Sequence, residues 1–286
     1  MNIRRLRKFI GQTLPPVVSV LRLSGVIGAM GSLRQGLSIA TTASLIERAF
    51  AVPDQAAVAL VINSPGGSPV QSALIGNRIR SLAVEKKVPV IAFVEDVAAS
   101  GGYWLACAAD EIIADANSIV GSIGVISAGF GFHDLIGRIG VERRLHASGE
   151  RKGMLDPFSP ERPEDVARLK RIQEDIHESF RAWVRARRGE KLKAPESELF
   201  TGEFWTGTRG LELGLIDGIG DARGVLRARF GEKVVLRPVG ARRPWLSRRL
   251  GFTGSAVMAG EGVAHGIAAG LLAAAEERAW WGRYGL

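Results

Sequence analysis

The chain has almost no cysteine and little histidine. Among its 286 residues there is one cysteine, Cys107, and there are four histidines. A single cysteine excludes an intrachain disulfide and a multi-cysteine zinc site, and no two histidines stand at metal-ligand spacing. The sequence therefore predicts no metal site and no cofactor, and it fits a reducing compartment.

A clear signal peptide or membrane-spanning segment is also missing. The stretch 1–20 begins with basic residues, but Gln12, Thr13, Pro15 and Pro16 interrupt its apolar residues. A spanning helix needs a longer uninterrupted apolar run, and a signal peptide needs an unbroken apolar centre. We therefore expect a protein that is cytoplasmic or peripheral to a membrane.

Acidic residues are outnumbered, with 29 Asp and Glu against 38 Lys and Arg, which gives a net charge of +9. The arginines cluster near residues 4–8, 143–151, 185–188 and 242–249. Such clusters can meet nucleic acid or an anionic membrane surface. Because no nucleic-acid motif is present and aromatic residues do not interleave with the arginines, we predict no nucleic-acid partner and leave peripheral membrane contact open.

Apolar residues make up 46% of the chain, enough for a large core. In the first half, short β-branched runs alternate with helical patterns. This order predicts an α/β fold with parallel strands joined by right-handed crossovers. The predicted strands are 17–23, 57–63, 88–95 and 111–116, and the predicted helices are 41–50, 69–82 and 101–110.

The pattern changes after residue 140. Residues 141–148 form a candidate strand, and an apolar stripe predicts a long helix over about 163–187. We expect the main domain to be residues 1–236, followed by a basic linker at 237–250 and an Ala/Gly-rich helical tail at 251–286. Glycines spaced by four in the tail would let another helix approach closely. A helix packed on protein or lying on a membrane, a true span, and disorder all stay open there.

Two glycine-bearing turns follow consecutive predicted strands. SPGGS follows the strand 57–63, and VAASGGYW follows the strand 88–95. Parallel strands place both turns at their carboxyl ends, where α/β proteins carry their sites. The N–H groups of Gly66, Gly67 and Gly101 are therefore expected to converge and to bind negative charge, as an oxyanion hole does. Ser100, in the second turn, is either a nucleophile or a turn residue.

A serine nucleophile needs a base to accept its proton. None of the four histidines has an evident acidic partner, and the Gly-x-Ser-x-Gly pattern of α/β-hydrolases is absent around Ser100. A lysine can act as the base only when burial keeps it neutral. Lys152 is followed by the apolar Met154 and Leu155. Considered without other information, however, its surroundings in the sequence are typical of a solvated surface lysine.

Four segments in one order resemble the signal peptide peptidase A (protease IV) family of serine peptidases. They cover roughly residues 17–235, and they read VINSPGGSPVQSALI, VEDVAASGGYWLACAADEIIADANSIVGSIGVI, SGERKGMLDPFSP and FWTGTRGLELGLIDGIG. The resemblance implies a crotonase/Clp-protease-like β-α spiral with a mostly parallel sheet. It also implies the short, single-copy form of the family, whose subunits assemble into homo-oligomers.

The resemblance further implies a Ser-Lys dyad. Ser100 of AASGGYW would be the nucleophile, and Lys152 of SGERKG would be the general base. Ser122 of VGSIGV matches a serine that orients the lysine amine, although without the resemblance it reads as a turn serine. Gly67 and the N–H of Gly101 match the oxyanion-hole positions.

These expectations favour a metal-free serine endopeptidase that cleaves extended peptides with apolar or small side chains, such as signal-peptide remnants or membrane-protein fragments. One alternative is a crotonase-like enzyme that uses the same oxyanion hole on a CoA thioester. Another is a catalytically inactive scaffold that binds a membrane surface through its arginine clusters and its tail. A Ser-Lys pair at the family's spacing argues against both.

Overall fold

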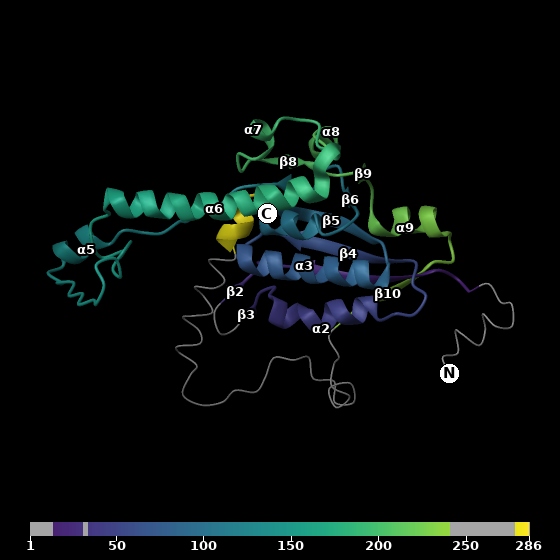
Figure 1. Cartoon of the computed structure of the whole chain (residues 1–286), viewed down its shortest axis with the longest axis horizontal. Coiled ribbons are helices and arrows are strands. Elements are labelled where there is room, and N and C mark those ends of the chain that lie inside the picture. Colours follow the sequence, from purple (N-terminus) through teal and green to yellow (C-terminus); the bar gives the residue numbers. More distant parts are fainter. Residues whose placement is uncertain (1–13, 31–33, 241–277, 286) are drawn as a thin grey trace, which may run out of the picture.

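The computed structural model of the chain describes residues 14–30, 34–240 and 278–285. Its centre is a mostly parallel sheet, shown in Figure 1, in the order β10-β1-β4-β5-β6-β9, with β7 and β8 attached beside β5. The strands are β1 (Val17–Ser24), β2 (Ala29–Met30), β3 (Arg34–Gln35), β4 (Ala57–Ser64), β5 (Val90–Ala99), β6 (Glu111–Ala114), β7 (Ile119–Gly121), β8 (Phe204–Thr206), β9 (Gly218–Ile219) and β10 (Val235–Pro238).

Helices cover both faces of the sheet. The helical elements are α2 (Ile39–Phe50), α3 (Pro69–Lys86), α4 (Gly101–Ala106), α5 (His133–Arg138), α6 (Pro163–Arg188), the 3-10 turn η1 (Gly189–Lys191), α7 (Glu196–Leu199), α8 (Gly207–Glu212) and α9 (Ala222–Phe230). Successive residues of β4 point to opposite faces: Leu60 packs in the cluster under α2, α3 and α4, and Ala59 packs with Leu226 of α9. Double coverage explains the nearly continuous apolar sequence of β4. The predicted α/β class is confirmed.

The strand predicted at 88–95 is longer in the structure, because β5 continues through Glu95 and Asp96 to Ala99. Both acids find partners on other strands of the sheet, β4 next to β5 and β1 beyond it. Glu95 pairs with Arg22 of β1, and Asp96 accepts a hydrogen bond from the side chain of Asn63 at 2.6 Å. The extension carries the chain to the point where the turn at Ser100 begins.

The strand predicted at 141–148 is wrong. These residues are exposed and form no strand, and no neighbouring strand lies alongside them. A strand needs a partner for its backbone groups, and here the chain runs through an arm that we define as residues 126–160. Figure 1 shows α5, which belongs to the arm, lying beyond the amino end of α6 and away from the sheet.

The predicted domain boundaries are only partly covered by the structure. β10 pairs with β1 and runs to Pro238, past the boundary expected at residue 236. Residues 241–250 of the basic linker and residues 251–277 of the tail lie outside the described residues. The described end of the tail is helical at residues 278–282. In the part of the chain that the structure describes, no helix has the length and apolar character needed to cross a membrane.

One buried ion pair fixes the carboxyl end of α6. Arg188, only 3% exposed, donates to Asp217 at 2.7 Å and to the carbonyl of Gly214 at 2.6 Å. Burial disfavours the charge on Asp217, but hydrogen bonds from Arg188 and from the backbone N–H of Ile112 outweigh it and hold the pKa of this carboxyl below its ordinary value. The pair therefore anchors α6 to the segment before β9.

Replacing Asp217 by Ala is expected to lower the free energy of unfolding at neutral pH by about 3–5 kcal/mol, because it leaves the Arg188 guanidinium buried and unpaired. A depressed pKa stabilises the fold above the unfolded pKa, and this stabilisation is lost as the pH falls through the folded value. The difference between parent and variant should therefore narrow in acid. Urea denaturation across pH measures it. Asp175→Ala, at an exposed carboxylate, is the matched control, and an equal loss in both variants would contradict the assignment.

Candidate active site

The two glycine turns meet at the carboxyl ends of β4 and β5. A Cβ added to Gly66 would lie 2.8 Å from the carbonyl oxygen of Ala99, from the nitrogen of Gly101 and from the Cβ of Ser100. Gly66 also has a φ of +100°, in the region that favours glycine. The two turns therefore converge, and their contact requires a residue without a side chain at Gly66. The N–H of Gly66, expected among the free donors, instead donates to the Oγ of Ser64 at 3.2 Å.

Gly67 is held by the segment that follows β1. The N–H of Ile27 donates to the carbonyl of Gly66 at 2.8 Å, and the N–H of Ser68 donates to the carbonyl of Ile27 at 2.7 Å. In this parallel bridge the N–H of Gly67 itself points away from Ile27. Among the described residues, neither this N–H nor that of Gly101 has a hydrogen-bond acceptor. Two donors are thus left for a ligand.

Ser100 has an unusual backbone for a serine. Its φ is +52° and its ψ is −120°, and such left-handed values are strained for a residue with a side chain. Its N–H donates to the carbonyl of Gly121 at 2.8 Å, and its carbonyl accepts from Trp104 at 3.0 Å. Although Ser100 stands at the N-cap of α4, its hydroxyl caps nothing and bonds to none of the described residues. A plain turn or cap serine would use that hydroxyl.

Ser100, Gly67 and Gly101 line one small cavity of about 10 Å³, room for roughly one water molecule. Its other walls are Pro69, Trp104, Gly124, Val125, Ile176 and Phe180. Phe180 of α6 stacks on Trp104 of α4 with ring centroids 4.8 Å apart. The apolar face of the long helix was expected from its spacing, but nothing in that spacing showed that it covers this cavity.

Ser122 directly follows β7, next to the residue that accepts the hydrogen bond from Ser100. Its side chain is buried, at 6% exposure, and its φ is +55°. Its N–H donates to the carbonyl of Glu203 at 2.7 Å. The hydroxyl of Tyr284, a residue that the sequence analysis missed, lies 3.4 Å from the Ser122 Oγ. No sequence pattern linked a tyrosine 162 positions away to this serine.

Within one chain the structure does not bring Lys152 to Ser100. Lys152 is exposed on the arm and lines a separate, shallow surface pocket with residues 148–151. It is absent from the walls of the cavity at Ser100. A lysine base needs a desolvated setting, and the single chain does not provide one for this residue.

None of the described histidines takes the place of Lys152 beside Ser100. The Nε2 of His177, on α6, lies 3.1 Å from the carbonyl oxygen of Ile123. This contact ties α6 to the turn after Ser122. In the described part of the chain no histidine bonds to Ser100, so the arrangement does not form a Ser-His pair.

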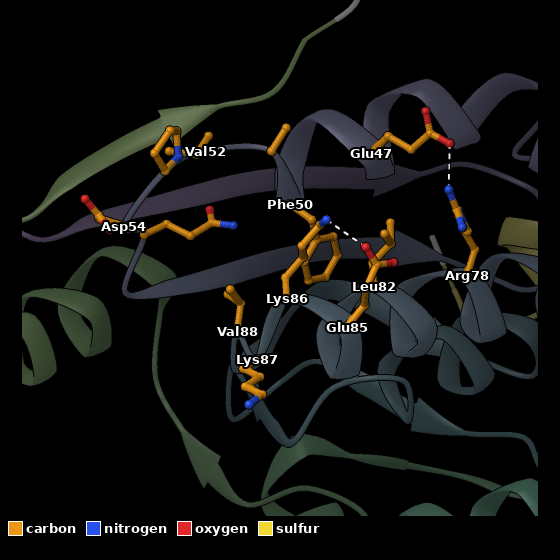
Figure 2. A pocket seen from close by; sticks show the side chains of 13 residues that line it. Glu47, Phe50, Val52, Asp54, Arg78, Leu82, Glu85, Lys86, Lys87 and Val88 are labelled. Carbon is orange, nitrogen blue, oxygen red and sulfur yellow. Dashed lines mark hydrogen bonds and ion pairs between the residues drawn. The ribbon is translucent and has the colours of Figure 1, made fainter. Parts of the chain in front are cut away.

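A larger pocket, of about 710 Å³, lies at the opposite end of the sheet, where β4 and β5 begin (Figure 2). Four of its charged side chains are paired with one another. Arg78 pairs with Glu47 at 2.7 Å, and Lys86 pairs with Glu85 at 2.7 Å. Because α/β sites lie at the carboxyl ends of strands, we assign no catalysis to this pocket.

Comparison with known proteins identifies relatives of the chain. The family model described as "Peptidase family S49" matches residues 83–233. The chain is 32% identical to a probable protease SohB of Buchnera aphidicola subsp. Schlechtendalia chinensis, over 77% of this chain and 68% of that protein. A solved structure of a membrane-bound stomatin-specific protease variant aligns with a TM-score of 0.48 and 17% identity, over 80% of this chain and 99% of that one.

A protein of Brucella abortus (strain 2308) named Na(+)/H(+) antiporter NhaA is 53% identical over 94% of the chain. The chain spans only 37% of that protein's length, and the same holds for the corresponding protein of Brucella melitensis. That name therefore belongs to a much longer protein, and no activity of this chain follows from it.

Replacing Gly67 by Ala tests the geometry of the turns. The new Cβ would lie 2.0 Å from the carbonyl oxygen of Ile27, at a φ of +139°, so the turn must shift. We expect a loss of about 1–3 kcal/mol in the free energy of unfolding. We also expect acylation of Ser100 by a fluorophosphonate probe to slow by about 100-fold or more, because one N–H donor moves. Gly240→Ala, where a Cβ also meets open space and which lies outside the arm and the site, is the control. Unchanged labelling in Gly67→Ala would contradict the oxyanion role.

Proposed function

Because the chain belongs to peptidase family S49, we propose that it is a serine peptidase whose nucleophile is Ser100. The observation that carries the proposal is the turn at residue 100. A strained serine with an unbonded hydroxyl stands beside two unbonded N–H groups in one cavity. This combination is what attack on a carbonyl requires, and a structural turn has no use for it.

In the proposed reaction the Oγ of Ser100 attacks the carbonyl carbon of the scissile peptide bond while a base takes the hydroxyl proton. The carbonyl oxygen becomes an oxyanion that accepts hydrogen bonds from the N–H groups of Gly67 and Gly101, each worth about 3 kcal/mol. The protonated base then gives its proton to the leaving amine. Water, deprotonated by the same base, hydrolyses the acyl-enzyme and releases Ser100.

We infer that the base is Lys152 of a second copy of this chain. The arm that carries Lys152 exposes large apolar side chains, and Phe130 is 81% exposed. Exposed apolar surface of this kind marks a contact with a partner. The exposed apolar residues of the arm are Ile126, Phe130, Phe132, Leu135, Ile139, Val141, Leu145 and Phe158. Docking of the arm on a neighbouring copy would bury it and would bring the amine to Ser100 and Ser122.

The substrate side of the proposal rests on the cavity at Ser100. Its size and its apolar walls, among them Trp104, Val125 and Ile176, suit a small apolar side chain next to the cleaved bond. An extended peptide rich in such residues, as in signal-peptide remnants or membrane-protein fragments, is the proposed substrate class. A crotonase-like use of the same N–H pair on a CoA thioester needs no serine nucleophile, so it would leave Ser100 without a role.

A complementation experiment tests the dyad and its division between two copies. Ser100→Ala and Lys152→Met should each abolish peptide hydrolysis and labelling of Ser100 by a fluorophosphonate probe. When the two variants are mixed and allowed to reassemble, random pairing should restore about a quarter of the parent activity, since each working site needs one intact residue from each copy. Lys233→Met, at another exposed lysine, is the control and should match the parent.

The outcomes separate the alternatives. Parent-like labelling of Lys152→Met would show that another group is the base. Two inactive variants that recover nothing on mixing would place the lysine and the serine in the same chain. A folded parent that is never labelled would favour a thioester enzyme or an inactive scaffold.

The cavity wall supplied by α6 should control side-chain preference. Replacing Ile176 by Ala enlarges the cavity, so kcat/KM for a substrate with leucine at the cleaved bond should rise relative to alanine by about tenfold or more. The measurement is a competition between two matched fluorogenic peptides. Ile172→Ala changes an exposed position of the same helix and should keep the parent ratio. An unchanged ratio in Ile176→Ala would place the side-chain pocket elsewhere.

A further inference from the structure

The described end of the tail packs against the side of the active site that holds Ser122. Tyr284 is only 8% exposed and clusters with Val97 and Ala99 of β5, with Ile119 partly buried against them. Its ring meets that of Phe204 edge-on, with centroids 5.0 Å apart. A segment that merely trailed in solvent would not bury an aromatic ring against the sheet beside the site.

The hydroxyl of Tyr284 connects the first glycine turn to the turn that follows β7. It lies 3.4 Å from the carbonyl oxygen of Pro65, in the turn that holds Gly67, and 3.4 Å from the Oγ of Ser122. A phenol has one proton, so it can donate to Pro65 while it accepts from Ser122. Both contacts are long, and a competing amine could therefore replace them.

Tyr284 lies where the lysine of the proposed dyad has to arrive. The amine must reach the Oγ of Ser122 to be oriented, and Ser122 is 6% exposed with Tyr284 against it. The cavity that would hold the substrate side chain is a different place, because no residue of the described tail lines it. The described tail therefore covers Ser122 and does not line the cavity at Ser100.

We propose that the segment around Tyr284 is an intramolecular plug that competes with Lys152 of a second copy for Ser122. The inference rests on the proposed function. A single chain with the plug in place has a nucleophile and an oxyanion hole but no base. Docking of a neighbour's arm and departure of the plug then occur together, so that activity appears on assembly.

The test compares three variants of the full chain. Tyr284→Ala removes the ring and should label at Ser100 about tenfold faster than the parent at low protein concentration, a shift of about 1.4 kcal/mol. Tyr284→Phe keeps the ring and should stay close to the parent, since occlusion depends on the ring. Trp280→Ala, in the same segment but outside the buried cluster, is the matched control. Circular dichroism confirms that each variant is folded.

A second measurement does not depend on catalysis. In a Ser100→Ala background, sedimentation velocity should show that Tyr284→Ala assembles at a lower concentration than the chain with Tyr284. A synthetic peptide of residues 278–286, added to the Tyr284→Ala chain, should slow labelling again, and a scrambled peptide should not.

Each of the following results either supports or overturns the plug. Slower labelling in both Tyr284→Ala and Tyr284→Phe would overturn the plug and make Tyr284 a positioning residue for Ser122. Parent-like labelling and assembly in Tyr284→Ala would also overturn it. Easier assembly without labelling of any chain would support the plug while refuting the proposed peptidase activity.

Discussion

The close approach of two backbone turns, possible only without side chains at Gly66 and Gly67, is the constraint on which the site depends. A Cβ at Gly66 would collide with the turn at Ser100, and a Cβ at Gly67 would collide with Ile27. The contact holds the N–H groups of Gly67 and Gly101 near one cavity before any substrate arrives. Donors that are already in place need no reorganisation during the reaction, and this is the source of their value to catalysis.

The neighbouring elements hold the contact between the two turns, and they keep Ser100 in its strained backbone conformation. Ser100 has a left-handed backbone that is held by hydrogen bonds to Gly121 and Trp104. α6 covers the cavity with Phe180, and the buried pair of Arg188 and Asp217 fixes the end of the same helix. A strained residue persists only when its surroundings hold it, so the distant ion pair and the turn at Ser100 belong to one structural unit.

The proposed function and the proposed plug describe one division of labour. In this proposal the sheet and its covering helices provide the nucleophile, the oxyanion donors and the cavity. The arm carries Lys152 on exposed apolar surface. Tyr284 stands beside Ser122, the place that the lysine needs. Two groups that require the same hydrogen-bonding partner exclude each other, and this exclusion would couple activity to assembly.

The sequence by itself determined the alternation of strands and helices in the first half of the chain, the α/β class and the pairing of two glycine turns at the carboxyl ends of strands, because these follow from local periodicity and glycine's freedom. It failed at 141–148, where a strand-like pattern has no partner strand, and at Glu95 and Asp96, whose partners come from other strands. Only the tertiary structure decided that α6 covers Ser100, that Lys152 stands apart from it within one chain, and that Tyr284 reaches Ser122. Those are contacts between distant segments, and no local pattern encodes which segments will meet.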